Sequence, residues 1–79
     1  MERYDFEVRQ GDDTIASERC VELRGSKAVW LRISELASRP YAPGCRISVT
    51  DQWGEIIMLI GIATARRSFA IGAVQQAGA

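Results

Sequence analysis

Two cysteines are the residues of this 79-residue chain whose side chains are best suited to chemistry. A thiol nucleophile needs a base to accept its proton, and histidine usually supplies it. The chain contains no histidine, so neither Cys20 nor Cys45 has that partner. The missing imidazole also removes the commonest metal ligand in proteins. We therefore expect no catalytic residue and a role that is not enzymatic.

Four carboxylates gather in the first third of the chain and invite comparison with a cation site: Asp12, Asp13, Glu18 and Glu22. A calcium loop needs oxygen ligands at tight alternating positions around a glycine turn, and this spacing lacks them. The two cysteines fit no zinc pattern and cannot form a disulfide framework. We expect free thiols, no metal and no cofactor.

Arginine supplies nine of the ten basic residues, and its planar guanidinium suits phosphate contacts. Arg66 and Arg67 are adjacent, and with Arg46 they are the candidate nucleic-acid contacts. Ten acidic residues balance the ten basic ones, so no net field draws the chain to a polyanion. A solvated, ion-paired sheet surface is the favoured interpretation, and nucleic-acid binding is the alternative.

Alternating apolar residues predict the elements that would position these side chains. We predict an antiparallel sheet with a bulged or broken second strand, formed by residues 3–9, 14–23, 45–51 and 55–63. Residues 26–38 are predicted to form a helix with Ser26 as its N-cap. Its apolar stripe, which should pack on one sheet face, contains Val29, Trp30, Ile33, Leu36 and Ala37.

These elements predict a two-layer α+β fold in the order ββαββ, with one central helix. Residues 1–64 would form the single domain. Residues 65–79 would be an extension, either a short helix or partly disordered. The opening five residues are too charged for a signal peptide, and the apolar run 56–65 is about half a membrane span. We expect a cytoplasmic protein without membrane contact.

The last predicted strand is apolar on both faces, which is typical of a strand covered on both sides. One helix covers only one face of a sheet. The second cover is either the C-terminal stretch 65–77 or a second copy of the chain. We favour a homodimer, an interaction or regulatory module whose interface comprises Trp53, Ile56, Met58, Ile60 and Ile62. Trp53 lies in a predicted turn, so its alternative is to fold back over the strands.

Three motifs suggest a family: Arg3-Tyr4-x-Phe6-x-Val8-Arg9-x-Gly11-Asp12, Val21-Glu22-Leu23 and Val49-x-Asp51-x-x-Gly54. Over residues 3–62 the chain resembles a group of short bacterial proteins of unknown function, common in alphaproteobacteria such as the rhizobia. It departs from that group at Glu2, where proline is usual, and at Cys20, where glycine is common. The helix is also poorer in alanine. The resemblance implies a bacterial cytoplasmic setting and this order of elements, but no activity or ligand.

Overall fold

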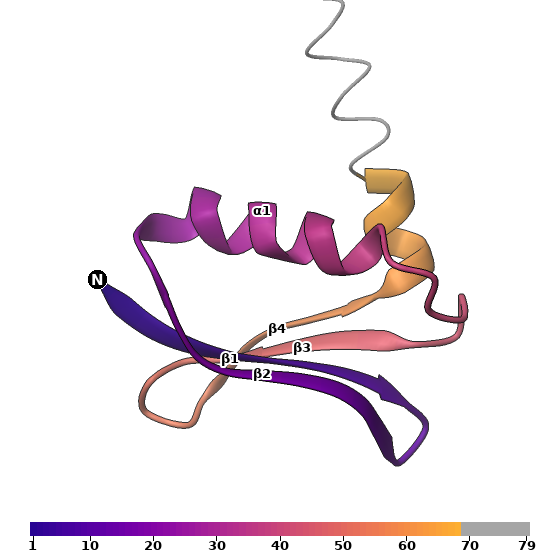
Figure 1. Cartoon of the computed structure of the whole chain (residues 1–79), viewed down its shortest axis with the longest axis horizontal. Coiled ribbons are helices and arrows are strands. Elements are labelled where there is room, and N and C mark those ends of the chain that lie inside the picture. The colour runs from indigo at the N-terminus through magenta and orange to yellow at the C-terminus, as the bar shows by residue number, and fades with distance from the viewer. Residues whose placement is uncertain (69–79) are drawn as a thin grey trace, which may run out of the picture.

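Apolar side chains at every second position make the first strand, β1 (Glu2–Gln10), and bury one face of it. Tyr4, Phe6 and Val8 all lie in the core. The computed structural model describes residues 1–68, in which helices cover one face of a four-stranded sheet (Figure 1). The predicted α+β class and the antiparallel four-stranded sheet are confirmed.

The second strand, β2 (Asp13–Leu23), is continuous but irregular. Its antiparallel register with β1 shifts twice, between Tyr4 and Phe6 and between Val8 and Arg9. The prediction of a bulged second strand is therefore confirmed. At the first shift Cys20 adopts a φ of 56°, and its N–H donates to Oδ1 of Asp5 at 2.9 Å. A non-glycine residue in this left-handed region is strained.

The helix α1 (Gly25–Ala37) packs its apolar stripe on the sheet. Val29, Ile33, Leu36 and Ala37 are buried as predicted, whereas Trp30 remains partly exposed. The helix begins earlier than predicted. Arg24 occupies the N-cap position and no side chain caps the helix, so the prediction of Ser26 as N-cap is wrong.

The strands β3 (Arg46–Thr50) and β4 (Ile56–Gly61) form an antiparallel hairpin. The strand order is β2-β1-β3-β4, so β1 and β3 are central and β4 is an edge strand. The predicted fourth strand, 55–63, ends earlier than expected because a second helical segment, residues 62–68, begins at Ile62. The described order is thus ββαββα rather than ββαββ.

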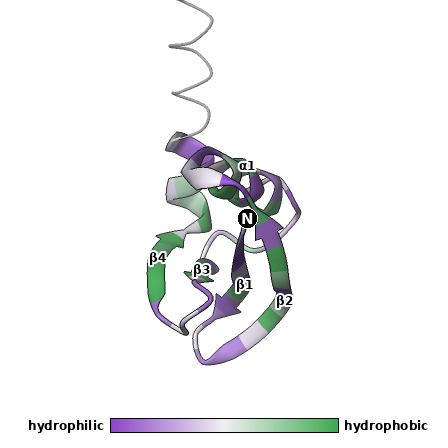
Figure 2. Cartoon of the chain, turned by 90° about the vertical axis from the view of Figure 1, so that its left-hand side faces the viewer, coloured by the Kyte–Doolittle hydropathy of each residue, from purple (hydrophilic) through white to green (hydrophobic). Residues whose placement is uncertain are grey.

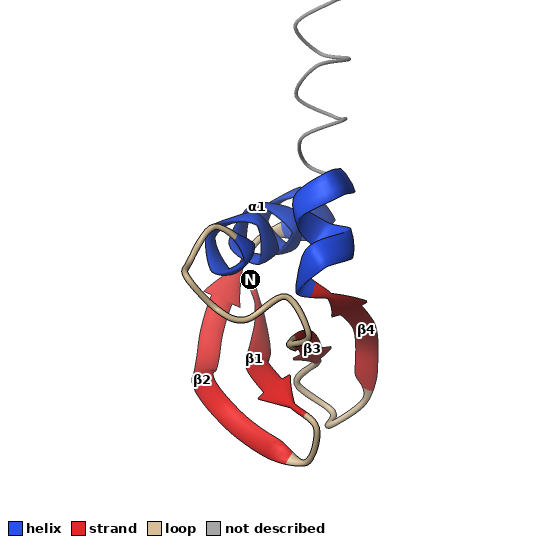
Figure 3. Ribbon diagram, turned by 90° about the vertical axis from the view of Figure 1, so that its right-hand side faces the viewer, coloured by secondary structure: helices blue, strands red, loops and turns tan. Residues whose placement is uncertain are grey.

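The helical segment 62–68 lies on the same side of the sheet as α1 (Figure 3). Ile62 and Ala65 are buried in the shared core, so the boundary predicted at residue 64 falls inside this segment. The rest of the predicted C-terminal stretch, residues 69–79, lies outside the described residues.

Arg66 fastens this segment to the end of α1. Its Nε donates to the carbonyl oxygen of Ala37 at 2.7 Å, and its Nη2 donates to those of Arg39 and Tyr41 at 2.8 and 3.0 Å. Ala37 is the last residue of α1 and its carbonyl has no partner within the helix, so the bond from Nε satisfies an acceptor that would otherwise need water.

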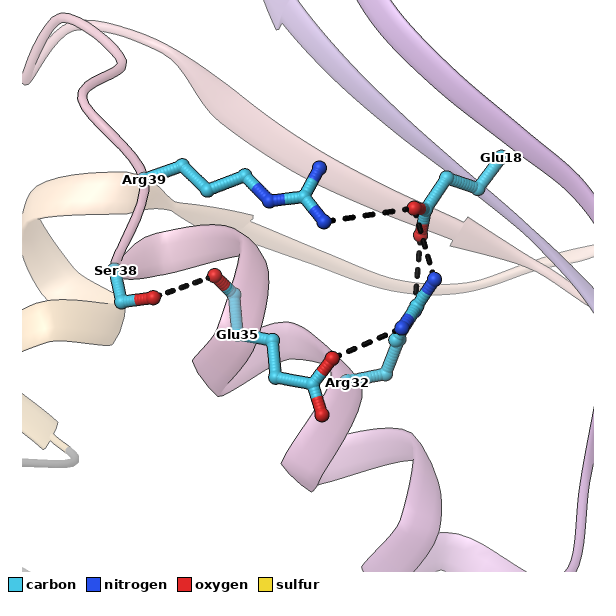
Figure 4. A network of polar contacts seen from close by, with 5 residues as sticks. All are labelled: Glu18, Arg32, Glu35, Ser38 and Arg39. Carbon is cyan, nitrogen blue, oxygen red and sulfur yellow. Dashed lines mark hydrogen bonds and ion pairs between the residues drawn. The ribbon is translucent and has the colours of Figure 1, made fainter.

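An ion-pair network holds the other edge of the sheet to α1 (Figure 4). Arg32 contacts Glu18 of β2 at 2.8 Å and Glu35 of its own helix at 2.9 Å. Arg39 approaches the same Glu18 carboxylate at 3.8 Å. The network ties β2 to α1 at a position where the cross-strand partner of Glu18 is the buried Phe6.

Replacing Arg66 should loosen the packing of the 62–68 segment. We expect Arg66→Ala to lower the free energy of unfolding by about 2 kcal/mol, because three backbone acceptors lose a charged donor. Arg66→Lys should recover only part of this loss, since an ammonium group lacks the planar fork. Urea denaturation measures both. Arg67→Ala is the matched control, because within residues 1–68 Arg67 makes one long side-chain contact, 3.4 Å to Thr64. Equal effects at the two positions would contradict this role for Arg66.

Cys20 should be a position where glycine is better than alanine. We expect Cys20→Gly to be more stable than Cys20→Ala by about 1 kcal/mol, because glycine adopts positive φ without steric cost. Both variants lose the thiol and keep the N–H bond to Asp5, so their difference isolates the backbone term. Paired chemical denaturation curves give the comparison. An alanine variant as stable as the glycine variant would show that the backbone at this bulge is unstrained.

Candidate functional site

The outer edge of β4 is the most distinctive surface of the described chain. Ile62 N–H donates to the carbonyl oxygen of Cys45 at 2.9 Å, next to the pair formed by Arg46 and Gly61. In an antiparallel ladder, bonding and non-bonding residues alternate. Met58 and Ile60 therefore bond to β3. Leu59 directs its backbone N–H and C=O groups outward and Gly61 directs its N–H outward, where residues 1–68 provide no neighbouring strand. The alternation ends at the bulge before Met58, because Asp51 N–H donates to the carbonyl oxygen of Glu55 and Thr50 pairs with Ile56.

Leu59 also has an exposed apolar side chain. Leu59 lies opposite Ser48, which lies opposite Glu7, so all three share the sheet face that points away from α1, here called the open face. The register also shifts between Val49 and Thr50, which makes Ile57 an additional residue next to Ile56. Ile56, Ile57 and Leu59 all remain exposed as a result.

We call Trp53, Ile56, Ile57 and Leu59 the edge patch. Trp53, in the turn before β4, is 76% exposed. Figure 2 shows β4 as an apolar strand at one margin of the sheet. The patch leaves several hundred Å² of apolar surface in water, as large as the largest patch of a typical monomer and often a sign of binding.

The structure divides the interface residues that the sequence predicted. Trp53 and Ile56 are exposed, Met58 and Ile60 are half-buried against the core, and Ile62 is fully buried. Ile57 and Leu59, which the predicted interface leaves out, are exposed as well. The interface hypothesis therefore needs Ile57 and Leu59 in place of Met58, Ile60 and Ile62. Trp53 does not fold back over the strands.

The two sheet edges differ in chemistry. β2 has charged residues along its length and two bulges, and both features discourage pairing with another strand. The β4 sequence IIMLIG contains no charged residue and no proline. An apolar edge of this kind readily accepts a further strand. Only β2 therefore carries the protection expected of an edge that stays unpaired.

The open face has no cover among residues 1–68. The C-terminal stretch 65–77 was one predicted cover for the second face of the last strand. Its described part instead leaves β4 toward α1 and is fastened there by Arg66. Around β1 and β3 the open face is polar, with Arg9 opposite Arg46. Only its β4 margin is apolar.

The three candidate nucleic-acid contacts do not form one patch. Arg46 lies on the open face, since its neighbour Ile47 is buried toward α1. Arg66 lies on the α1 side, where backbone carbonyls occupy its guanidinium. Arg67 is exposed beside Thr64. Arg66 is thus committed to holding the fold together, which sequence spacing could not reveal.

A depression between the N-terminus and the 51–54 turn is lined by Met1, Arg3, Asp5, Cys20, Asp51, Gln52 and Gly54. The two carboxylates that line it accept hydrogen bonds from backbone N–H groups. Asp5 accepts from the Cys20 N–H, and Asp51 Oδ1 accepts from the N–H groups of Trp53 and Glu55, both at 2.9 Å. Both carboxylates of the depression therefore stabilise the local backbone conformation. The second thiol, Cys45, is free, as predicted, and is buried in the core.

Near this depression Tyr4 donates its hydroxyl to Oε2 of Glu2 at 2.7 Å. The hydrogen bond to that carboxylate, helped by desolvation, raises the pKa of Tyr4 above its ordinary value near 10. A raised folded-state pKa stabilises the fold below pH 10 and loses that contribution as the pH rises further. The contact is therefore intact at neutral pH.

Within residues 1–68, no three histidine, cysteine, aspartate or glutamate side chains come together as a metal site. No helix of that region has the length and apolar character to cross a bilayer. Comparison with protein-family models, curated proteins and solved structures found no match for this chain.

Proposed function

We propose that the protein is a small, non-catalytic interaction or regulatory module that self-associates through the outer edge of β4. One observation carries the proposal: among residues 1–68, β4 is an uncharged edge strand with outward backbone groups at Leu59 and with exposed apolar side chains at Ile56, Ile57 and Leu59. Addition of a strand to such an edge supplies main-chain hydrogen bonds for affinity and side-chain contacts for specificity.

The charge distribution supports binding to a protein surface rather than to a polyanion. The net charge is zero, and the edge patch has no charged side chain that would need to be desolvated. Trp53 adds an exposed indole, and tryptophan is among the residues that contribute most to protein interfaces. In contrast, Arg46 and Arg66 lie on opposite sides of the sheet, which weakens the nucleic-acid alternative.

A lysine placed on β4 should disrupt self-association without disturbing the fold. We expect Leu59→Lys to raise the dissociation constant of the homodimer at least tenfold, about 1.4 kcal/mol, because its ammonium group would be buried against apolar side chains. Sedimentation equilibrium over a range of concentrations measures the constant.

Leu31→Lys is the matched control, because Leu31 on α1 is 58% exposed and Leu59 is 59% exposed. The two variants make the same chemical change at equal exposure, so a general solubility effect would act on both alike. Wild-type protein that stays monomeric at high concentration, or equal weakening by the two variants, would refute the proposed function.

A further inference from the structure

We propose that Arg9, Arg46 and Ser48 form a binding site for a single phosphate group on the open face. Such a site is independent of the proposed self-association, because its three side chains lie on β1 and β3 rather than on the outer edge of β4. The ligand is an oxyanion, carried either by a free small molecule or by a phosphorylated side chain of a protein.

Two arginines face each other across the central pair of strands. Arg9 of β1 lies directly opposite Arg46 of β3, and both side chains are exposed. Their neighbours Val8 and Ile47 are buried toward α1, so both guanidinium groups belong to the open face. Directly opposed residues have Cβ atoms about 5 Å apart, where like charges destabilise a sheet. A phosphate bound between the two groups replaces this repulsion with attraction.

No ion pair within residues 1–68 neutralises these two arginines, since the ion pairs of that region all involve Glu18 or Glu35. Glu7 lies two residues before Arg9 on the same face. Its Oε2 accepts from the hydroxyl of Thr14 at 3.5 Å, and Thr14 belongs to β2, on the side of β1 away from β3. The side of the pair toward β3 therefore keeps its positive charge.

The donors of both arginines are available to a ligand. Arg9 Nη2 donates to the carbonyl oxygen of Asp12 at 3.4 Å, which is a long contact to an uncharged acceptor. The Arg46 side chain has no hydrogen-bond partner in the described part of the chain. A guanidinium group presents its donors in a planar fork that matches two oxygens of a phosphate.

Ser48 adds an unused polar group beside Arg46. It lies two residues further along β3 on the same face, about 6.6 Å away along the strand. Ser48 is only 8% exposed, and its hydroxyl has no hydrogen-bond partner among residues 1–68. Polar groups that are largely buried normally have a partner, so a hydroxyl without one indicates a missing ligand. In the proposed site this hydroxyl donates to an oxygen that Arg46 also contacts.

The position on the other side of Arg46 leaves space for the ligand. Gly61 of β4 lies opposite Arg46 and has no side chain. A Cβ atom placed on Gly61 would meet one atom of the described residues within 4 Å, Oγ1 of Thr64 at 3.7 Å. The sheet surface next to Arg46 is therefore open, and a tetrahedral anion can reach the guanidinium group from solvent.

The charge pattern favours one phosphate group over a nucleic-acid strand. Alternate residues of β1 place Asp5 and Glu7 on the same face as Arg9. A polyanion that extended along this face would approach both carboxylates. The chain also has no net charge to attract a polyanion over a distance.

Titration with sodium phosphate, followed by amide NMR spectra, tests the site, with sodium chloride of equal ionic strength as the reference. We expect saturable shifts of the Arg46 and Ser48 amide signals. Arg46→Gln should raise the dissociation constant for phosphate about tenfold, because a charged donor is lost. Arg19→Gln is the matched control, since it removes the same charge from an exposed arginine of β2. Screening should limit its effect to about twofold.

Ser48→Ala provides a second measurement that does not change the charge. We expect it to raise the dissociation constant about threefold, because one neutral donor is lost. Its stability in chloride should match that of the wild type, since the hydroxyl has no partner in the described structure. Equal weakening by Arg46→Gln and Arg19→Gln would overturn the site, as would an absence of saturable shifts in the wild type.

Three further probes identify what carries the phosphate. Tighter binding of acetyl-phosphoserine-leucine amide than of glycerol 3-phosphate would support a phosphorylated protein segment, whose leucine could contact Leu59 opposite Ser48. Equal binding of the two would support a free small molecule. Binding of oligothymidylate that is much tighter than either and falls steeply with salt would overturn the single-phosphate site in favour of a nucleic-acid surface.

Discussion

One layer of helix can keep water from only one face of a four-stranded sheet, and this constraint organises the whole molecule. α1 and the segment 62–68 both lie on the same face, where Ile33, Ile47 and Ile62 are completely buried. The polar residues of β1 and β3 allow their part of the open face to remain in contact with water. β4 is different, because its apolar residues continue onto the open face and its outer backbone groups have no neighbouring strand in the described structure. The proposed self-association addresses both features with one contact.

Different contacts attach the two edges of the sheet to the helical layer. At β2, Glu18 forms ion pairs with Arg32 of α1 and with Arg39, which follows α1. The charges and bulges of β2 also make it a poor template for pairing with another strand. At the opposite margin Arg66 donates to three carbonyls beyond and within the end of α1. That contact holds the chain after β4 on the helical side. It thereby keeps the segment 62–68 from covering the open face near Leu59.

Much of the architecture could be predicted from local patterns. The alternation around Phe6 and the apolar stripe around Ile33 each depend on burial of one face, which sequence periodicity records directly. The N-cap at Ser26 was wrong because Gly25, with a φ of 80°, already starts the helix without a side-chain cap. Strand order was out of reach, since periodicity does not say which neighbour a strand takes. For that reason a two-sided apolar strand could not be recognised as an edge.

The sequence prediction and the structure select different residues of the same strand for the candidate site. A strand that is apolar on both faces does not say which face meets the helix. That choice depends on the register of the hairpin, which places Met58 opposite Val49 and includes one additional residue at Ile57. Val49 is buried, so pairing Met58 with Val49 across the hairpin would have predicted Met58 as a core residue. The role of Arg66 was equally hidden, because its acceptors are backbone atoms 25 to 29 positions away.

The central claim is that a neighbouring copy satisfies the outward backbone groups of β4, and amide hydrogen exchange measures this most directly. The account predicts that the amide of Leu59 exchanges more slowly as protein concentration rises, while outward amides of β2 do not change. Rapid exchange of the Leu59 amide at every concentration would contradict it.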